Sequence, residues 1–191
     1  MIAAKPFAAV ALFIATVQTA ILGYMIEGRA SILRSGTDVL LKTAPVDPRD
    51  LLRGDYVILT YDISTISTTS ITGTRPETGE VARLNVRLKP GVDGFWTVSA
   101  ASFDPLAEEA GSVVLISQPV TIYDWEWQNA GNLTVSYGIE RFYVPEGEGR
   151  PIEDGRNQGR VSVAVRVSED GQAQIRALML DNEPLYEEPL Y

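Results

Sequence analysis

The sequence predicts an all-β domain, a mostly antiparallel sandwich or open barrel, preceded by one transmembrane helix at the amino terminus. Three observations support this prediction. Residues 7–26 contain no charged side chain, later segments alternate apolar and polar residues, and glycine-containing turns join those segments. A chain of 191 residues has room for one such helix and one domain of ordinary size.

The apolar helix is expected over residues 7–26, FAAVALFIATVQTAILGYMI. Twenty residues rising about 1.5 Å each span ~30 Å, the thickness of a bilayer's hydrocarbon core. We expect a retained signal anchor with a single span in the inner (cytoplasmic) membrane, because the segment is long enough to cross it and lacks a clean cleavage site. Most of the soluble sequence follows the span, as expected when the amino terminus lies inside. Lys5 precedes the span and Arg29 follows it, so charge gives only a modest orientation signal. The alternative is a cleaved signal peptide with Phe7–Val17 as its apolar region.

We divide the chain into an anchor with its juxtamembrane segment, residues 1–36, and a β domain, residues 37–191. Alternation is clearest in residues 161–168, where four valines share one face. Residues 64–80 and 145–160 are expected to be loops, and no helix of normal length is expected in the domain. About nine strands are predicted, at residues 39–42, 56–63, 81–88, 95–102, 112–116, 120–127, 132–139, 161–168 and 173–180.

The amino-acid composition argues against several classes of function. The chain has neither Cys nor His, so thiol nucleophiles, imidazole bases and the usual transition-metal ligands are missing. A net charge of −9 repels phosphate backbones, so no nucleic-acid partner is expected. Acidic pairs such as Glu108-Glu109 follow no calcium-loop pattern and fit a solvated surface. We therefore expect no enzyme activity, no catalytic residue, no cofactor and no metal site.

The most specific pattern is the segment 47–61, DPRDLLRGDYVILTY. A turn opens it, one helical turn follows, and Gly54 suits the left-handed residue that ends that turn. In the strand after it, Leu59 and Tyr61 lie on the apolar face, whereas Tyr56 points the other way.

Five residues match every fixed position of the motif that names the GDYXXLXY family of bacterial membrane-anchored proteins: Gly54, Asp55, Tyr56, Leu59 and Tyr61. The later segment 137–147, YGIERFYVPEG, resembles a second block of that family, and residues 178–186 resemble its closing region. The resemblance implies an anchored extracytoplasmic β domain without an established activity. It also implies a polytopic membrane protein as a candidate partner.

We interpret the motif as mainly structural. Gly54 permits the turn, Asp55 hydrogen-bonds turn amides, and the side chains of Leu59 and Tyr61 fill the core. In the functional alternative, Asp55 and Tyr56 converge with a possible interaction surface at Glu140 and Arg141 to bind a ligand or another protein.

Two other patterns are set aside. A Pro-containing turn followed by Gly-Asp and a strand is also similar to part of the signal-peptidase family, which uses a Ser nucleophile and a Lys base. This chain offers only Thr43 before the turn, and Lys89 falls in a predicted hairpin turn, where its amine is solvated. Trp125 and Trp127 alternate with acidic residues, and we favour core packing over a sugar-binding platform.

The function that these observations favour is a non-catalytic accessory or interaction partner of an integral membrane protein or complex. Its domain is expected on the periplasmic side of the membrane that residues 7–26 cross. The alternative is a small-ligand-binding or hydrolytic domain with an unrecognised site. A deep pocket lined by Asp55, Tyr56, Glu140 or Arg141 would favour that alternative.

Overall fold

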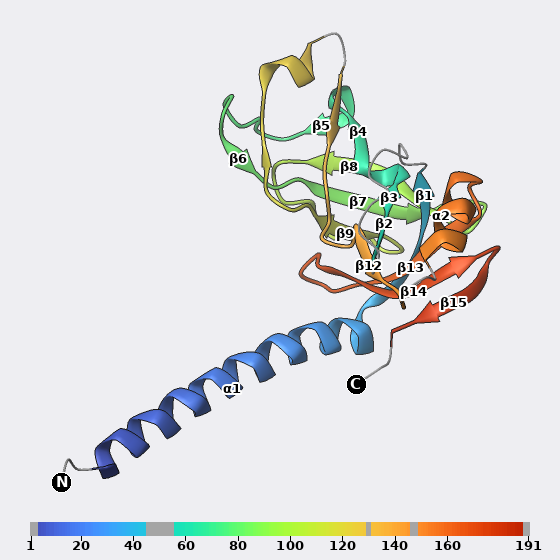
Figure 1. Cartoon of the computed structure of the whole chain (residues 1–191). Coiled ribbons are helices and arrows are strands. Elements are labelled where there is room, and N and C mark those ends of the chain that lie inside the picture. Colours follow the sequence, from blue (N-terminus) through green and yellow to red (C-terminus); the bar gives the residue numbers. More distant parts are fainter. Residues whose placement is uncertain (1–3, 45–55, 129–130, 146–148, 189–191) are drawn as a thin grey trace.

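A long helix, α1 (Ala4–Ser35), leads into a domain built mostly of short strands, as the computed structural model shows (Figure 1). The structure describes residues 4–44, 56–128, 131–145 and 149–188. This architecture confirms the predicted class, an all-β domain preceded by one apolar helix. The strands are β1 (Thr37–Ala44), β2 (Tyr56–Ile58), β3 (Thr60–Tyr61), β4 (Thr65–Ser67), β5 (Ile71–Thr72), β6 (Val81–Ala82), β7 (Asn85–Pro90), β8 (Trp96–Ser102), β9 (Val113–Ile116), β10 (Val120–Thr121), β11 (Asn132–Thr134), β12 (Arg141–Tyr143), β13 (Val161–Val167), β14 (Ala173–Leu180) and β15 (Glu183–Glu187).

Two larger sheets organise the domain. The first has the strand order β15-β14-β13-β1-β3 and is antiparallel throughout. The second has the order β5-β8-β7-β9, in which β5 alone runs parallel to its neighbour. Short pairs, β10-β6, β11-β4 and β12-β2, complete the domain. The two hairpins predicted from glycine-containing turns, β7–β8 and β13–β14, are both present.

The core lies where the apolar faces of these strands meet. Residues Val161, Val163, Val165 and Val167 of β13 are all buried, as their alternation predicts. Ser162 and Ala164, on the opposite face of the same strand, are buried too. That second face is covered because both α1 and α2 (Gly149–Asn157) contact β13.

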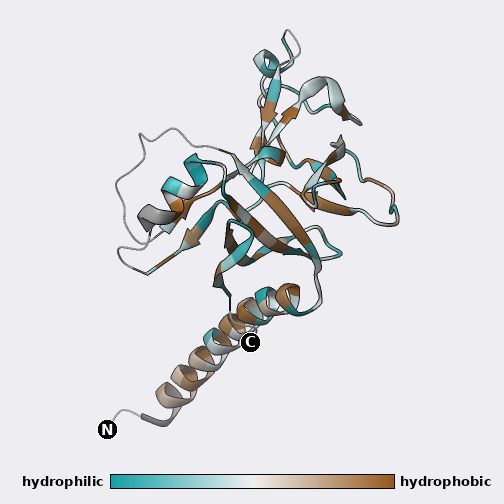
Figure 2. Ribbon diagram, turned by 90° about the vertical axis from the view of Figure 1, so that its right-hand side faces the viewer, coloured by the Kyte–Doolittle hydropathy of each residue, from teal (hydrophilic) through white to brown (hydrophobic). Residues whose placement is uncertain are grey.

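The helix α1 runs nine residues beyond the predicted span and joins the domain without a break. Its side chains are exposed from Phe7 to Arg29, whereas Ala30 and Leu33 are buried where α1 contacts β13 and β14. The hydropathy colouring along most of α1 is apolar to neutral (Figure 2). Residues Phe7–Ser35 contain a stretch with a mean hydropathy of 1.9, enough in length and composition to cross a membrane or to act as a signal sequence.

The carboxyl end of α1 is fastened to the sheet. Arg166 of β13 donates hydrogen bonds to the carbonyl oxygens of Leu33 (2.8 Å) and Arg34 (3.0 Å), two acceptors that a helix end leaves unpaired. The same guanidinium donates from Nε and Nη2 to the Asp38 carboxylate, at 3.1 Å each. A side chain on Gly36 would place its Cβ 2.6 Å from the Ile32 carbonyl oxygen, so only glycine fits this close approach.

Two predicted loops are partly regular structure. Residues 64–80 contain β4, η3 (Thr68–Ser70) and β5, because β4 pairs with β11 and β5 pairs with β8. Residues 145–160 contain α2, a helix that the sequence prediction missed. Ile152 and Arg156, four residues apart on one face of α2, are buried, so tertiary contacts stabilise a segment with weak helix propensity.

The predicted strand 120–127 is also wrong beyond its first two residues. The backbone leaves β10 after Thr121 and forms a 3₁₀ turn, η4 (Asp124–Trp127). The Glu126 carboxylate accepts a hydrogen bond from the Tyr123 amide at 2.9 Å, which caps the turn. Successive side chains therefore fan out around the turn, and the two indoles at 125 and 127 do not share a strand face.

Candidate functional site

The described part of the motif begins at Tyr56 and forms β2 and β3. Val57, Leu59 and Tyr61 point inward and are buried, as the alternation predicts. Strand β3 pairs with β1, and β2 pairs with β12 so that Tyr56 lies opposite Tyr143. Gly54, Asp55 and the turn predicted before them lie outside the described residues.

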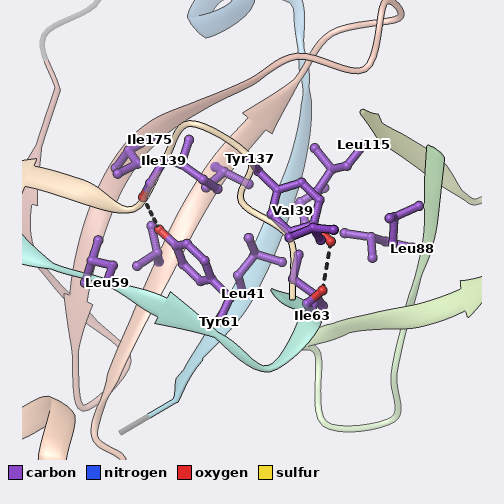
Figure 3. Close-up of a cluster of buried hydrophobic side chains, with 14 of the residues drawn as sticks. Val39, Leu41, Leu59, Tyr61, Ile63, Leu88, Leu115, Tyr137, Ile139 and Ile175 are labelled. Atoms are coloured by element: carbon purple, nitrogen blue, oxygen red, sulfur yellow. Dashed lines mark hydrogen bonds between the residues drawn. The ribbon is translucent and has the colours of Figure 1, made fainter. Parts of the chain in front are cut away.

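Two buried tyrosines link the motif to the segment that ends in β12. The Tyr61 hydroxyl donates a hydrogen bond to the carbonyl oxygen of Ile139 at 2.5 Å. The Tyr137 hydroxyl donates to the carbonyl oxygen of Ile63 at 2.8 Å (Figure 3). Each tyrosine thus reaches the carbonyl two residues beyond the other tyrosine. We call these four residues the tyrosine clasp; it satisfies two buried hydroxyls and two buried carbonyls at once.

Glu140 holds the turn on which the clasp depends. Its carboxylate accepts hydrogen bonds from the amides of Tyr137 (2.5 Å) and Gly138 (2.9 Å), and its carbonyl accepts one from the Leu59 amide at 2.9 Å. Gly138 has φ of +84°, a left-handed conformation that favours glycine. The Glu140 side chain is therefore committed to the turn of its own segment, whereas Arg141 points outward and is exposed.

The clasp hydroxyls are placed to hold structure, not to exchange protons near neutral pH. Burial raises the pKa of Tyr61 well above its ordinary value of 10.0, and the nearby negative charge of Glu140 raises it further. The same two causes raise the pKa of Tyr137. Both hydroxyls therefore remain protonated donors over the physiological range.

The outer face of β2 and β12 carries a different set of side chains. The rings of Tyr56 and Tyr143 lie 6.0 Å apart at 60°, and the Arg141 guanidinium lies 5.6 Å from the Tyr56 ring centroid. Tyr143 is 72% exposed. Within the described residues, Arg141 makes no ion pair. We call Tyr56, Arg141 and Tyr143 the Tyr–Arg cluster. The structure thus brings together two of the four residues proposed to converge, and adds Tyr143, whose spacing from Arg141 already places both on one strand face.

Arg156 of α2 contacts the motif strand β2, and no pattern in the sequence predicted this contact. It is only 4% exposed, and its Nη1 donates to the Ile58 carbonyl oxygen at 2.5 Å. Its Nη2 donates to the Asn157 side chain at 3.4 Å, and its Nε has no hydrogen-bond partner in the described part of the chain. The side chain is therefore a buried cation that touches a carbonyl of the motif strand.

The residues weighed for Ser–Lys chemistry have other roles. The Thr43 hydroxyl is buried and donates to the Val161 carbonyl oxygen at 2.6 Å. Lys89 lies at the end of β7, not in the turn after it, because β7 extends to Pro90; its ammonium group pairs with Glu109. A half-open pocket of about 190 Å³ lies elsewhere, between the segment after η2 (Asp62–Ser64) and β8. It is lined by Thr65, Ile66, Ser67, Ser70, Val98, Ser99, Ala100 and Ala101.

Comparison with models of protein families gives a match. A family model described as GDYXXLXY protein matches residues 18–178. Searches of the curated proteins and of the solved structures gave no match. The matched range runs from the middle of α1 to β14 and includes both halves of the tyrosine clasp. The chain therefore belongs to the GDYXXLXY family.

Proposed function

We propose that this protein is a non-catalytic, membrane-anchored interaction protein that binds an integral membrane partner through the Tyr–Arg cluster. The proposal rests on the contrast between the two faces of the motif strand. Its inward side chains are buried, while its outward face leaves Tyr143 72% exposed beside Tyr56 and Arg141. Packing accounts for the first set of residues but not for the second.

The chemistry of the cluster suits a protein interface. Tyr and Arg are enriched among the residues that contribute most to binding, since each combines a large apolar area with hydrogen-bonding groups. Strand pairing and ring contacts hold the cluster in place before binding, so little conformational entropy is lost. An acidic or aromatic side chain of the partner would complement the Arg141 guanidinium.

The helix α1 supplies the membrane attachment in this proposal. Its exposed apolar residues need a lipid environment, and its carboxyl end is fixed to the sheet by Arg166. With the amino terminus inside the cytoplasm, the domain lies on the periplasmic side of the inner membrane. A fixed junction would present the same face of the domain to a partner in the same membrane.

Site-specific photocrosslinking in intact cells tests the proposal. A photoreactive phenylalanine analogue at position 143 should give an adduct with one integral membrane protein. The same analogue at position 123, another exposed tyrosine, is the matched control and should not give that adduct. In the protein with the analogue at 143, Arg141→Glu should reduce the adduct at least tenfold. The same adduct from both positions, or none from position 143, would refute the proposal.

A further inference from the structure

The turn η4 exposes two aromatic side chains at the end of the domain away from α1 (Figure 1). Trp125 is 65% exposed and Tyr123 is 45% exposed. Their rings are nearly parallel, 18° apart in plane, with centroids 6.4 Å apart. Large aromatic surfaces in water are unfavourable, so two of them held together in solvent call for an explanation.

This exposure does not result from a loose turn. The Glu126 carboxylate is buried and caps the Tyr123 amide, as described above. Trp127, on the inner side of the turn, packs on Phe103 with 6.2 Å between ring centroids. The Arg75 guanidinium lies 4.4 Å from the Trp127 ring centroid and donates to the Asp124 carboxylate at 2.5 Å. The same contacts that order the turn thus fix the two outer rings in place.

Two charged side chains, Asp124 and Arg75, pair with each other at the same turn. The Trp125 indole N–H has no hydrogen-bond partner among the described residues. The side chains of Asp124 and Arg75 are 66% and 38% exposed, so both retain groups that face water. Hydrogen bonding to Thr78 and to Arg75 lowers the pKa of Asp124, which keeps this carboxylate ionised as an acceptor at neutral pH.

We propose that Tyr123 and Trp125 form a carbohydrate-binding platform, on which the apolar face of a pyranose ring stacks while Asp124 and Arg75 bind its hydroxyl groups. A pyranose combines a face of C–H bonds with a rim of hydroxyls, which matches two ring faces bordered by a donor and an acceptor. A protein partner would need about 800 Å² of surface with a largely apolar centre. The neighbouring exposed side chains include Glu77, Thr78 and Glu80, and Val81 of β6 adds a small apolar area opposite Thr121, so the apolar surface around the two rings is limited.

Charge selects the class of carbohydrate. Glu77 and Glu80 lie in the turn next to this platform, since the Ile122 amide donates to the Glu80 carbonyl oxygen at 2.9 Å. Anionic polysaccharides would be repelled by these carboxylates and by Asp124. The expected ligand is therefore a neutral glycan. This site lies on η4, apart from the Tyr–Arg cluster on β2 and β12, so it adds a second binding activity to the proposed function.

A titration with neutral oligosaccharides tests the proposal. The full chain is placed in lipid nanodiscs, because detergents with maltose or glucose headgroups would compete for the platform. The probes are the hexasaccharides of β-1,4-glucose, α-1,4-glucose and β-1,4-N-acetylglucosamine, followed by calorimetry and tryptophan fluorescence. At least one should bind saturably, with a Kd of roughly 0.1–1 mM. Trp125→Ala should weaken that binding at least tenfold, Trp125→Phe should weaken it less, and Tyr143→Ala should leave it unchanged.

Two results would overturn the inference. One is the absence of saturable binding by all three hexasaccharides up to roughly 10 mM, well above the Kd of a weak site. The other is binding that persists unchanged in a Trp125→Ala variant with an unaltered thermal midpoint. Neither result would affect crosslinking from position 143, so the platform and the proposed membrane partner can fail independently.

Discussion

The tyrosine clasp and the η4 platform, formed by Tyr123 and Trp125, both contain aromatic side chains, but the burial of the rings differs. In the clasp the rings are buried, and each hydroxyl donates to a main-chain carbonyl. In the platform the rings are exposed, and the Trp125 indole N–H has no partner among the described residues. A buried aromatic residue whose polar group is hydrogen-bonded stabilises the fold, whereas an exposed aromatic residue can contact a ligand or a partner. The comparison therefore distinguishes the residues that stabilise the fold from those that we propose to bind a ligand.

The largest effect is expected from removing a clasp ring. Tyr61→Ala should lower the free energy of unfolding by about 3–5 kcal/mol, because it leaves a cavity and an unpaired carbonyl at Ile139. Urea unfolding of the full chain in detergent measures this loss. Trp125→Ala is the control and should change stability by no more than about 0.5 kcal/mol. Similar losses in both variants would remove the distinction between the two regions.

Removing only the hydroxyls should have a smaller effect. Tyr61→Phe and Tyr137→Phe each leave a buried carbonyl without its donor, which should cost about 1–3 kcal/mol. Since both hydrogen bonds join the same two segments, the double variant should depart from additivity by at least about 0.5 kcal/mol. Unfolding of the three variants by urea completes the cycle. Strict additivity would mean that the two bonds act as separate contacts.

Alkaline pH should weaken the clasp through the same hydroxyls. Below pH 10 the tyrosines are protonated in both the folded and the unfolded chain, so their contribution to stability is constant. Above the ordinary pKa of 10.0 they ionise only in the unfolded chain, since burial raises the folded pKa of Tyr61 and of Tyr137. Stability should therefore fall as pH rises above 10, by about 1.4 kcal/mol per clasp tyrosine at pH 11. Urea midpoints between pH 8 and pH 11 measure the slope, and Tyr137→Phe should reduce it.

The smallest change in stability is expected at the Tyr–Arg cluster. Tyr143→Ala removes an exposed ring and should change the free energy of unfolding by no more than about 0.5 kcal/mol. Thermal unfolding checks this value. A loss of 2 kcal/mol or more, on the order of a core truncation, would make Tyr143 a structural residue and weaken the proposed interface.

The sequence predicted those parts of the fold in which the local pattern decides the structure. The four valines of β13 and the β13–β14 hairpin follow from alternation and from a glycine-containing turn. Helix α2 could not be predicted, because its stability comes from burying Ile152 and Arg156 against strands distant in sequence. The alternating acids and tryptophans at 124–127 match a strand and a capped turn equally well, and the Glu126 cap decides between them.

Part of the candidate site could also be predicted, because local strand alternation decides which side chains point inward. Strand phase placed Leu59 and Tyr61 inward and Tyr56 outward. It did not show that the Tyr61 hydroxyl would reach Ile139, because pairing between distant segments leaves no local signal in either of them. The interaction role of Glu140 stays a prediction, and its carboxylate has a structural role that the sequence did not predict, since it accepts hydrogen bonds from the Tyr137 and Gly138 amides. Exposure at Tyr143 and Trp125 depends on what the neighbouring strands leave uncovered, which only the three-dimensional arrangement reveals.

The fastening of α1 by Arg166 has a mechanical consequence for the proposed anchored state. Residues 27–35 continue the helix about 13 Å beyond the predicted span, as a rigid stem whose last turn is bonded to β13. Because α1 is bonded directly to the sheet, the β domain must tilt with the membrane helix by the same angle. Transmembrane helices tilt by about 20° on average and adjust to bilayer thickness. The orientation of both the Tyr–Arg cluster and the η4 platform would therefore depend on the thickness of the membrane that holds α1.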